Sequence, residues 1–293
     1  MSYVAQVEFP YSPRNITFMP AGCIHWPRTN KALLTEWVKA VGSNPHAFTM
    51  LVGDSFDFAR GRYRKHIGTY TDDLNSPEAV DDWVRRDVRD LAKILEPIRG
   101  KIIGVLEGNH YHRFMDGTNS EQELCRQLRL EYLGALGVVR VDFTQKNNKG
   151  RAREHLVIYG HHSGGSGGGR THGHDMNVLA RQAAVLDADI YVLSHTHDAY
   201  GKVIPIEMIN QQGKARVVLR ERAFIRTGCF MSRKTPRPSL SGSYQPSYQE
   251  RAAYPPRHSG WVEVKVIYER HKQRGADGGW SGETRSREMR ITS

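Results

Sequence analysis

The sequence of 293 residues contains only three cysteines, and they lie far apart at positions 23, 125 and 229. Such a small, odd and widely spaced set argues against a disulfide framework and favours a reducing compartment. The chain also lacks any run of about eighteen apolar residues, so we expect no transmembrane helix and no membrane partner. The first residues carry neither a basic segment nor an apolar stretch, so we expect no secretory signal and predict a cytoplasmic protein.

Acidic residues are scarce in the last third of the chain. The whole sequence has a net charge of +11, and residues 201–260 hold eleven basic residues against three acidic ones. This excess of positive charge can attract single-stranded nucleic acid, and aromatic rings among the cations can stack its bases. The same composition is equally typical of a solvated basic surface. The aromatic residues concerned are Tyr244, Tyr248, Tyr254, Trp261 and Trp280.

Five short clusters of metal-type ligands are present in order along the chain. Most of them follow an apolar run typical of a strand buried on both faces, at 48–52, 102–106, 156–158 and 190–193. Because the carboxyl ends of such strands open into one crevice, we expect the clusters to converge on a single site in an α/β fold. The clusters are Cys23 with His25, Asp54 with Asp57, Asn109 with His110, His161 with His162, and His195 with His197.

The remaining pattern predicts the organisation of the chain. Apolar residues at helical spacing predict helices over 30–41, 76–95, 121–136 and 176–186. Short strand-like runs follow at 202–206, 215–219, 223–227 and 261–268. We therefore expect a catalytic core over 1–232 that is completed by a final core strand at 261–269. The segment 233–260, rich in Pro, Ser, Tyr and Arg, is expected to be a surface insertion, and 270–293 a mobile tail.

The five clusters resemble the signature of the calcineurin-like metallophosphoesterases, which reads D-x-H, G-D-x-x-D, G-N-H-[E/D], H and G-H-x-H. The resemblance extends over roughly residues 15–230, and the glycine-rich stretch 163–169 is similar to the phage and prophage branch of that family. It implies a four-layer α-β-β-α sandwich with a dinuclear site at one edge of two packed sheets. It also implies two divalent transition-metal ions, Mn, Fe or Zn, as cofactors.

The resemblance implies a role for each matching residue. Asp54 would bridge both metals, because a carboxylate offers two oxygens. His110 would be a catalytic residue beside the leaving-group oxygen, and Asp57 would orient a ligand from behind it. Arg113, on the same loop as His110, could clamp a phosphate oxygen, although an exposed arginine without such a role fits the sequence equally well. The implied metal ligands are Cys23, His25, Asp54, Asn109, His161, His195 and His197.

The sequence departs from the signature at its first position, where Cys23 replaces aspartate. No shift of register restores the carboxylate, because Asp54 is the first aspartate of the chain. A thiolate binds zinc or ferrous iron well and magnesium poorly, so Cys23 as a ligand predicts a softer metal. Alternatively, Cys23 packs as a small buried hydrophobe and leaves one metal weakly held. A milder departure is Tyr111, which stands where the family often has an acid.

The fourth cluster is ambiguous in register. His161 and His162 point to opposite sides if the strand continues through them, so one of the two is expected to reach the metal. Alignment of the following Ser and glycines with the family pattern favours His161. His162 remains the alternative and is otherwise expected to bind substrate.

We therefore predict a metal-dependent phosphoester hydrolase that uses a metal-bridging hydroxide, with a phosphodiesterase or nuclease acting on nucleic acid or nucleotides as the preferred function. A phosphomonoesterase acting on proteins or small molecules is the alternative, because it uses the same metals. A non-catalytic scaffold of the same fold is a third possibility, since fold does not imply chemistry. The sequence does not indicate the oligomeric state.

Overall fold

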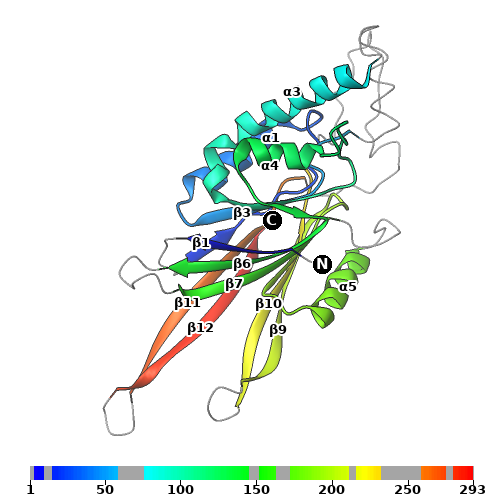
Figure 1. Cartoon of the computed structure of the whole chain (residues 1–293). Coiled ribbons are helices and arrows are strands. Elements are labelled where there is room, and N and C mark those ends of the chain that lie inside the picture. The colour runs from blue at the N-terminus through cyan, green and yellow to red at the C-terminus, as the bar shows by residue number, and fades with distance from the viewer. Residues whose placement is uncertain are drawn as a thin grey trace, which may run out of the picture.

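The computed structural model describes residues 3–9, 15–58, 76–144, 152–162, 172–210, 216–231, 259–274 and 280–292. These residues form two six-stranded sheets that pack against each other, with helices on their outer faces (Figure 1). Sheet A has the order β1 (Tyr3–Phe9), β6 (Leu136–Thr144), β7 (Ala152–His161), β8 (Ile190–Leu193), β10 (Arg216–Thr227) and β9 (Ala199–Asn210). Sheet B has the order β12 (Trp280–Thr292), β11 (Glu263–Arg274), β2 (Asn15–Phe18), β3 (Ala47–Val52), β4 (Ile102–Leu106) and β5 (Tyr132–Gly134).

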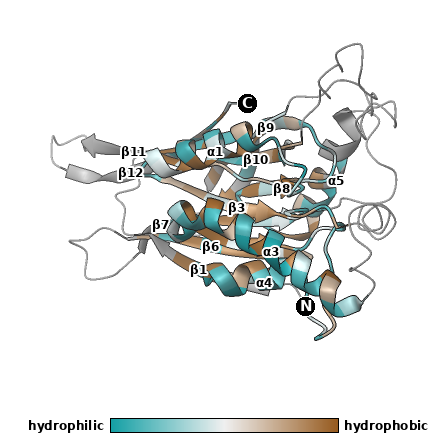
Figure 2. Cartoon of the chain, turned by 90° about the horizontal axis from the view of Figure 1, so that it is seen from above, coloured by the Kyte–Doolittle hydropathy of each residue, from teal (hydrophilic) through white to brown (hydrophobic). Residues whose placement is uncertain are grey.

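The helices divide between the two outer faces. Helices α1 (Lys31–Ser43), α3 (Pro77–Leu95) and α4 (Ser120–Leu128), with the short 3-10 helix η1 (Glu96–Lys101), cover sheet B, whereas α5 (His172–Val185) packs on sheet A. Apolar residues accordingly fill three interfaces: helices on sheet B, sheet on sheet, and sheet A on α5. Seen from above, apolar residues gather on the strands between the helices, as expected for strands covered on both faces (Figure 2). The fold is therefore the predicted four-layer α-β-β-α sandwich.

Local sequence signals set the best-predicted helices. Helix α3 begins where Ser76 Oγ accepts a hydrogen bond from Ala79 N at 3.2 Å, with Pro77 in its first turn. Helix α4 begins with a capping box, in which the Asn119 side chain accepts from Gln122 N and the Gln122 side chain accepts from Asn119 N. It ends at Arg129, which adopts a left-handed conformation. The predicted helix over 121–136 is therefore wrong in its second half, where β5 and the start of β6 lie.

Two further predictions differ from the structure. The mobile tail predicted from residue 270 is instead part of a strand pair, because β11 continues to Arg274 and β12 pairs with it antiparallel. The separate strands predicted at 215–219 and 223–227 form the single strand β10. Most of the insertion predicted at 233–260, like the glycine-rich stretch 163–169, lies outside the described residues. Among the described helices, none is long and apolar enough to span a membrane.

Strand direction places the five ligand clusters together. Strands β2, β3, β4 and β5 run parallel in sheet B, and β7, β8 and β10 run parallel in sheet A. The clusters lie in the loops that follow β2, β3, β4 and β8 and at the end of β7, whose last residue is His161, so each lies at the carboxyl end of its strand. Such ends form the usual binding edge of an α/β fold, and here the two sheets contribute to it together.

Candidate metal centre

Asp54 lies at the centre of this edge and is 1% exposed. Its Oδ1 accepts hydrogen bonds from the backbone N–H groups of Asn109 and His110, at 2.7 and 3.0 Å. Its Oδ2 faces imidazole nitrogens instead: the Nε2 atoms of His162, His25 and His110 lie 3.0, 3.9 and 4.0 Å away. One carboxylate oxygen is thus held by the backbone, and the other is directed at three histidines.

The pKa of Asp54 reflects this surrounding. Burial by itself would raise the pKa of the carboxyl, but the hydrogen bond from His162 and the nearby His25 and His110 hold it well below its ordinary value. Asp54 therefore keeps a negative charge at neutral pH inside a buried site, where a second charge of opposite sign would be strongly favoured.

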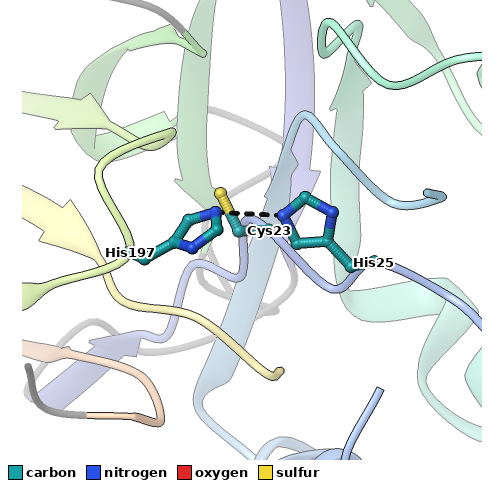
Figure 3. A group of neighbouring side chains, drawn as sticks. All are labelled: Cys23, His25 and His197. Atoms are coloured by element: carbon teal, nitrogen blue, oxygen red, sulfur yellow. Dashed lines mark hydrogen bonds between the residues drawn. The ribbon is translucent and has the colours of Figure 1, made fainter. Parts of the chain in front are cut away.

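Cys23, His25 and His197 form one side of the centre (Figure 3). Their ligand atoms all lie within 4.8 Å of one another, and the Nε2 atoms of His25 and His197 are 3.0 Å apart. Cys23 and His25 come from the loop after β2 in sheet B, whereas His197 comes from the loop after β8 in sheet A. This side of the centre therefore joins the two sheets.

Burial favours the neutral forms of all three side chains. It lowers the pKa of His25 to about 4, and together with His25 it lowers the pKa of His197 well below its ordinary value. Burial and the negative charge of Asp54 raise the pKa of the Cys23 thiol well above its ordinary value. Neutral imidazoles are ready to bind a cation, whereas the thiol must lose a proton on binding one.

The structure brings His162, rather than His161, to the centre. Along β7, Ile158 packs between the sheets and Tyr159 packs on the α5 side, so His161 shares the outer side with Tyr159. His162, 3% exposed, turns inward and places its Nε2 3.1 Å from Asn109 Oδ1 and 3.0 Å from Asp54 Oδ2. The pleat of the strand therefore favours the alternative register of the fourth cluster.

His195 completes the second side of the centre. Its ring meets the ring of His162 edge to face, with the centroids 5.2 Å apart. Its backbone N–H donates to Cys23 Sγ at 3.3 Å, and Cys23 Sγ also lies 3.1 Å from Ser194 Oγ. The thiol therefore contacts the loop after β8 as well as its own loop.

The carboxylate of Asp57 holds the ring of His110 at Nδ1. This nitrogen lies 2.7 Å from Asp57 Oδ1, and Arg28 NH1 lies 3.1 Å from the other oxygen of the same carboxylate. Burial would raise the pKa of Asp57, but the hydrogen bond from His110 and the charges of His25 and Arg28 lower it. The Asp57 carboxylate thus fixes the ring of His110 and leaves its Nε2 on the side of Asp54.

Backbone strain is concentrated at the centre. Six residues other than glycine have a positive φ among those described, and Arg129 alone of the six lies outside the ligand clusters. Such conformations cost on the order of 1–3 kcal/mol each and persist where the surrounding structure enforces them. The five at the centre are Cys23, His25, Asp54, His195 and His197, with φ values of 52°, 56°, 49°, 80° and 59°.

Two glycines of the motifs allow the loops to approach so closely. A Cβ atom at Gly108 would lie 2.0 Å from Asp54 Oδ1 and 2.1 Å from Asp54 N. Gly53 has a φ of 73°, and a Cβ there would lie 2.5 Å from the His162 ring. A side chain at either position would displace the carboxylate or the histidine.

The donor set fits divalent cations. His162 Nδ1 lies 2.9 Å from the carbonyl oxygen of Val52, to which it can only donate, so Nε2 is the ring atom directed at the oxygens of Asn109 and Asp54. In place of its hydrogen bond to Asp54, this nitrogen can offer a lone pair to a cation that lies among these oxygens. Ligand atoms about 2.0–2.3 Å from one ion are about 3–4 Å apart, in agreement with the distances at His162 and between His25 and His197.

Other residues predicted from the sequence lie elsewhere or go untested. Arg113 is exposed, and its backbone pairs with Asn119. Trp261 is half-buried and donates to Glu263 Oε1 at 3.3 Å. Tyr244, Tyr248 and Tyr254 lie outside the described residues, as does the side chain of Trp280. Arg28 and Ser194 were not predicted from the sequence, because no local pattern marks Arg28 and Ser194 lies directly before the cluster of His195 and His197.

No family model matches the chain, and no curated protein matches it. Similar solved structures include Vps29 complexed with Zn²⁺ from Entamoeba histolytica, with 14% identity, a TM-score of 0.40 and coverage of 94% of this chain and 99% of that chain. A conserved uncharacterized protein from Streptococcus pneumoniae TIGR4, described as a predicted phosphoesterase, has 15% identity, a TM-score of 0.32 and coverage of 94% and 98%. Vps29 from Cryptosporidium parvum has 13% identity, a TM-score of 0.31 and coverage of 95% and 98%.

Proposed function

We propose that the chain is a metal-dependent phosphoesterase of the calcineurin-like type that prefers phosphodiesters. The observation that supports this most strongly is the buried carboxylate of Asp54, which is held by two backbone N–H groups on one oxygen and faces three histidines with the other. A carboxylate in this position suits the link between two cations.

The proposal assigns the donors to two ions that share Asp54. Cys23, His25 and His197 would hold one ion with Asp54, and Asn109, His162 and His195 would hold the other. His162 thus takes the role that the sequence analysis gave to His161. Two divalent cations bound there would supply charge stabilisation for a phosphoryl group and a water of lowered pKa.

His110 is the proposed proton donor to the leaving-group oxygen. Asp57 accepts its Nδ1–H at 2.7 Å and stabilises the protonated ring, so Nε2–H is the group available toward the centre. General acid catalysis of this kind contributes about 10²–10⁴ in rate. Replacement of His110 with Ala should therefore slow turnover by that factor and leave the metal content unchanged; loss of bound metal would assign His110 a different role.

The thiol of Cys23 supports zinc or iron at the position that it shares with His25 and His197. A thiolate is a soft ligand, and the signature aspartate that it replaces is a hard one. We therefore propose that the native ions include at least one of these softer metals, with manganese as a substitute that supports activity in vitro.

The preference for a diester, such as nucleic acid or a nucleotide, is supported by the net charge of +11. Part of the basic excess in the described residues is balanced locally, because Arg220, Arg222 and Arg287 pair with Asp187 and Asp189. The substrate preference is accordingly the part of the proposal that needs the most direct test.

The test uses the full chain purified without chelator. Metal content is measured first, and turnover is then measured with manganese on bis-p-nitrophenyl phosphate, p-nitrophenyl phosphate and single-stranded DNA. The Asp54→Asn variant is the matched control, because it keeps the size of the side chain and removes its charge. We expect diester turnover that falls by about 10²-fold or more in this variant.

Each other outcome changes the assignment. Turnover of the monoester alone would make the protein a phosphomonoesterase. Well under one ion per chain, with no turnover of any substrate, would overturn the enzyme assignment and leave a non-catalytic scaffold.

A further inference from the structure

A buried arginine near the end of β10 has no role in the proposed reaction. Arg226 is 1% exposed and is among the largest fully buried side chains of the described residues. Its neighbour Ile225 packs between the two sheets, whereas Phe224 packs on the α5 side, so Arg226 shares the outer side with Phe224. A guanidinium in an interior position is costly unless it is paired and hydrogen-bonded.

The partners of Arg226 belong to the last histidine loop. Its Nε donates to Thr196 Oγ1 at 2.9 Å, and its NH2 group donates to the same oxygen. Its NH1 lies 3.5 Å from Asp198 Oδ2, and Asp198 is 3% exposed. Thr196 lies between His195 and His197 in the sequence, and Asp198 follows His197. The guanidinium therefore holds the two residues that alternate with the proposed ligands.

Thr227, the residue after Arg226, contacts the same loop from the opposite face of β10. Thr227 points inward, and its hydroxyl donates to Ser194 Oγ at 3.0 Å. Ser194 Oγ lies 3.1 Å from Cys23 Sγ, so this contact continues to the first ligand cluster. Two consecutive residues of β10, on opposite faces of the strand, thus fix the loop Ser194–Asp198 at both faces.

The stability of the fold alone does not explain why a charged side chain is buried at position 226. An apolar pair of similar volume in place of a buried ion pair is often neutral or stabilising. The loop, however, holds His195 and His197 at φ values of 80° and 59°, which need enforcement by their surroundings. We infer that Arg226 is a positioning residue, which acts through Thr196 and Asp198 to hold His195 and His197 in the geometry for metal binding. This inference rests on the proposed function.

The test compares full-length variants with a matched control. The double change Arg226→Met with Asp198→Asn removes both buried charges, so that neither is left unpaired. Thr196→Val is a milder variant that removes the accepting hydroxyl and keeps the ion pair. Arg220→Met is the control, because Arg220 lies on the same strand and pairs with Asp189 instead of the loop.

Four readouts separate positioning from a structural role. We expect the affinity for Co²⁺ to fall about 10–100-fold in the double variant, which is the usual effect of substituting residues that orient metal ligands. We also expect the visible spectrum of bound Co²⁺ to change. We also expect amide hydrogen exchange of residues 194–198 in the metal-free chain to accelerate about 10-fold or more. Thr196→Val should show the same effects to a smaller degree. The melting temperature of the double variant should stay close to that of Arg220→Met.

Failure of this inference and failure of the proposed function would give different results. A lower melting temperature with unchanged Co²⁺ affinity and unchanged exchange of residues 194–198, in both the double variant and Thr196→Val, would overturn the inference and make Arg226 structural. If the unmodified chain binds no Co²⁺, the proposed function fails, and exchange in the metal-free chain alone then decides whether Arg226 holds the loop.

Discussion

At the residue scale, the centre depends on a few side chains in conformations that the chain adopts only under constraint. Five of its residues have a positive φ, although none of them is glycine. Asp54 is an example, since at a φ of 49° its Oδ1 accepts hydrogen bonds from the backbone N–H groups of Asn109 and His110 on another loop. The hydrogen bonds of the folded loops therefore offset the local strain.

The roles of the two adjacent histidines can be separated by matched substitutions. His162→Ala should lower the affinity for Zn²⁺ by about 100-fold or more, because it removes a nitrogen that lies 3.0 Å from Asp54 Oδ2. His161→Ala should leave the affinity within about 3-fold, because that side chain faces the α5 side. Isothermal titration calorimetry on both variants measures the contrast. Equal losses, or a larger loss in His161→Ala, would restore the register first predicted from the sequence.

Glu121 is a buried acid that the proposed reaction does not use. It is 0% exposed, and burial raises the pKa of its carboxyl to about 8, although Ser120 donates a hydrogen bond to it. Because the pKa in the folded state lies above the ordinary value of 4.5, the folded state binds the proton more tightly than the unfolded state does. Stability should therefore decrease as the pH rises from about 4.5 to about 8.

Glu121→Gln tests this pH dependence. The variant should match the wild type near pH 4.5 and be more stable at pH 7, by an amount on the order of 3 kcal/mol, because wild-type Glu121 must take up a proton on folding at pH 7 and the neutral amide need not. Urea unfolding of both proteins from pH 4.5 to 8 measures the difference in the free energy of unfolding. A constant difference across this range would show that Glu121 does not titrate there.

At the scale of elements, the last two strands have more importance than the sequence indicates. β11 pairs with β2, and β12 pairs with β11 along its length. Met289 of β12 is 4% exposed, and its backbone N–H donates to Glu221 Oε2 at 2.6 Å. Arg287 reaches Asp189 Oδ1 at 2.7 Å, so β12 also connects sheet B to sheet A.

Truncation tests this role of β12. Deletion of residues 275–293 should lower the free energy of unfolding by about 2–5 kcal/mol or more, because the loss of one buried Met side chain alone costs that much. Met289→Ala in the full-length chain should give the smaller part of the effect. Both values come from urea midpoints by fluorescence. A truncated chain with an unchanged midpoint would agree with a mobile tail and contradict the strand pair.

At the scale of the whole molecule, the centre joins the two sheets. Loops that follow strands of sheet B carry Cys23, His25 and Asp54. Loops that follow strands of sheet A carry His162, His195 and His197. Cations bound by both sets would connect the two halves of the sandwich, and they would bind the folded chain alone, because unfolding separates the sets. Metal binding should therefore stabilise the entire fold.

Removal of metal measures this coupling. Zinc at about 100 times its dissociation constant should stabilise the protein by about 2.7 kcal/mol, and its chelation should lower the melting temperature by about 5–10 °C. Asp54→Asn is the control and should respond to chelator by much less. A melting temperature of the wild type that changes with neither chelator nor added zinc would argue against a metal that spans the sheets. Differential scanning calorimetry on the two proteins supplies the measurement.

Features that depend on neighbours along the chain could be predicted from the residues alone. Ser76 and Pro77 mark the start of α3, and the apolar runs at 102–106 and 190–193 coincide with β4 and β8. The types of ligand, and their places after strands, could be predicted for the same reason, because each motif is a few residues long. The parallel direction of the strands then brings the motifs to one edge, as strand ends in an α/β fold require.

Features that depend on partners far along the chain became clear from the three-dimensional fold. Strand β1 pairs with β6, and β12 pairs with β11. The side chain of Arg28 contacts Asp57, and that of Arg226 contacts Thr196. The choice between His161 and His162 depends on which side of β7 faces the crevice, which is set by packing between the sheets and not by the local sequence. A motif specifies which donors are present, whereas the packing of the two sheets decides which of them meet.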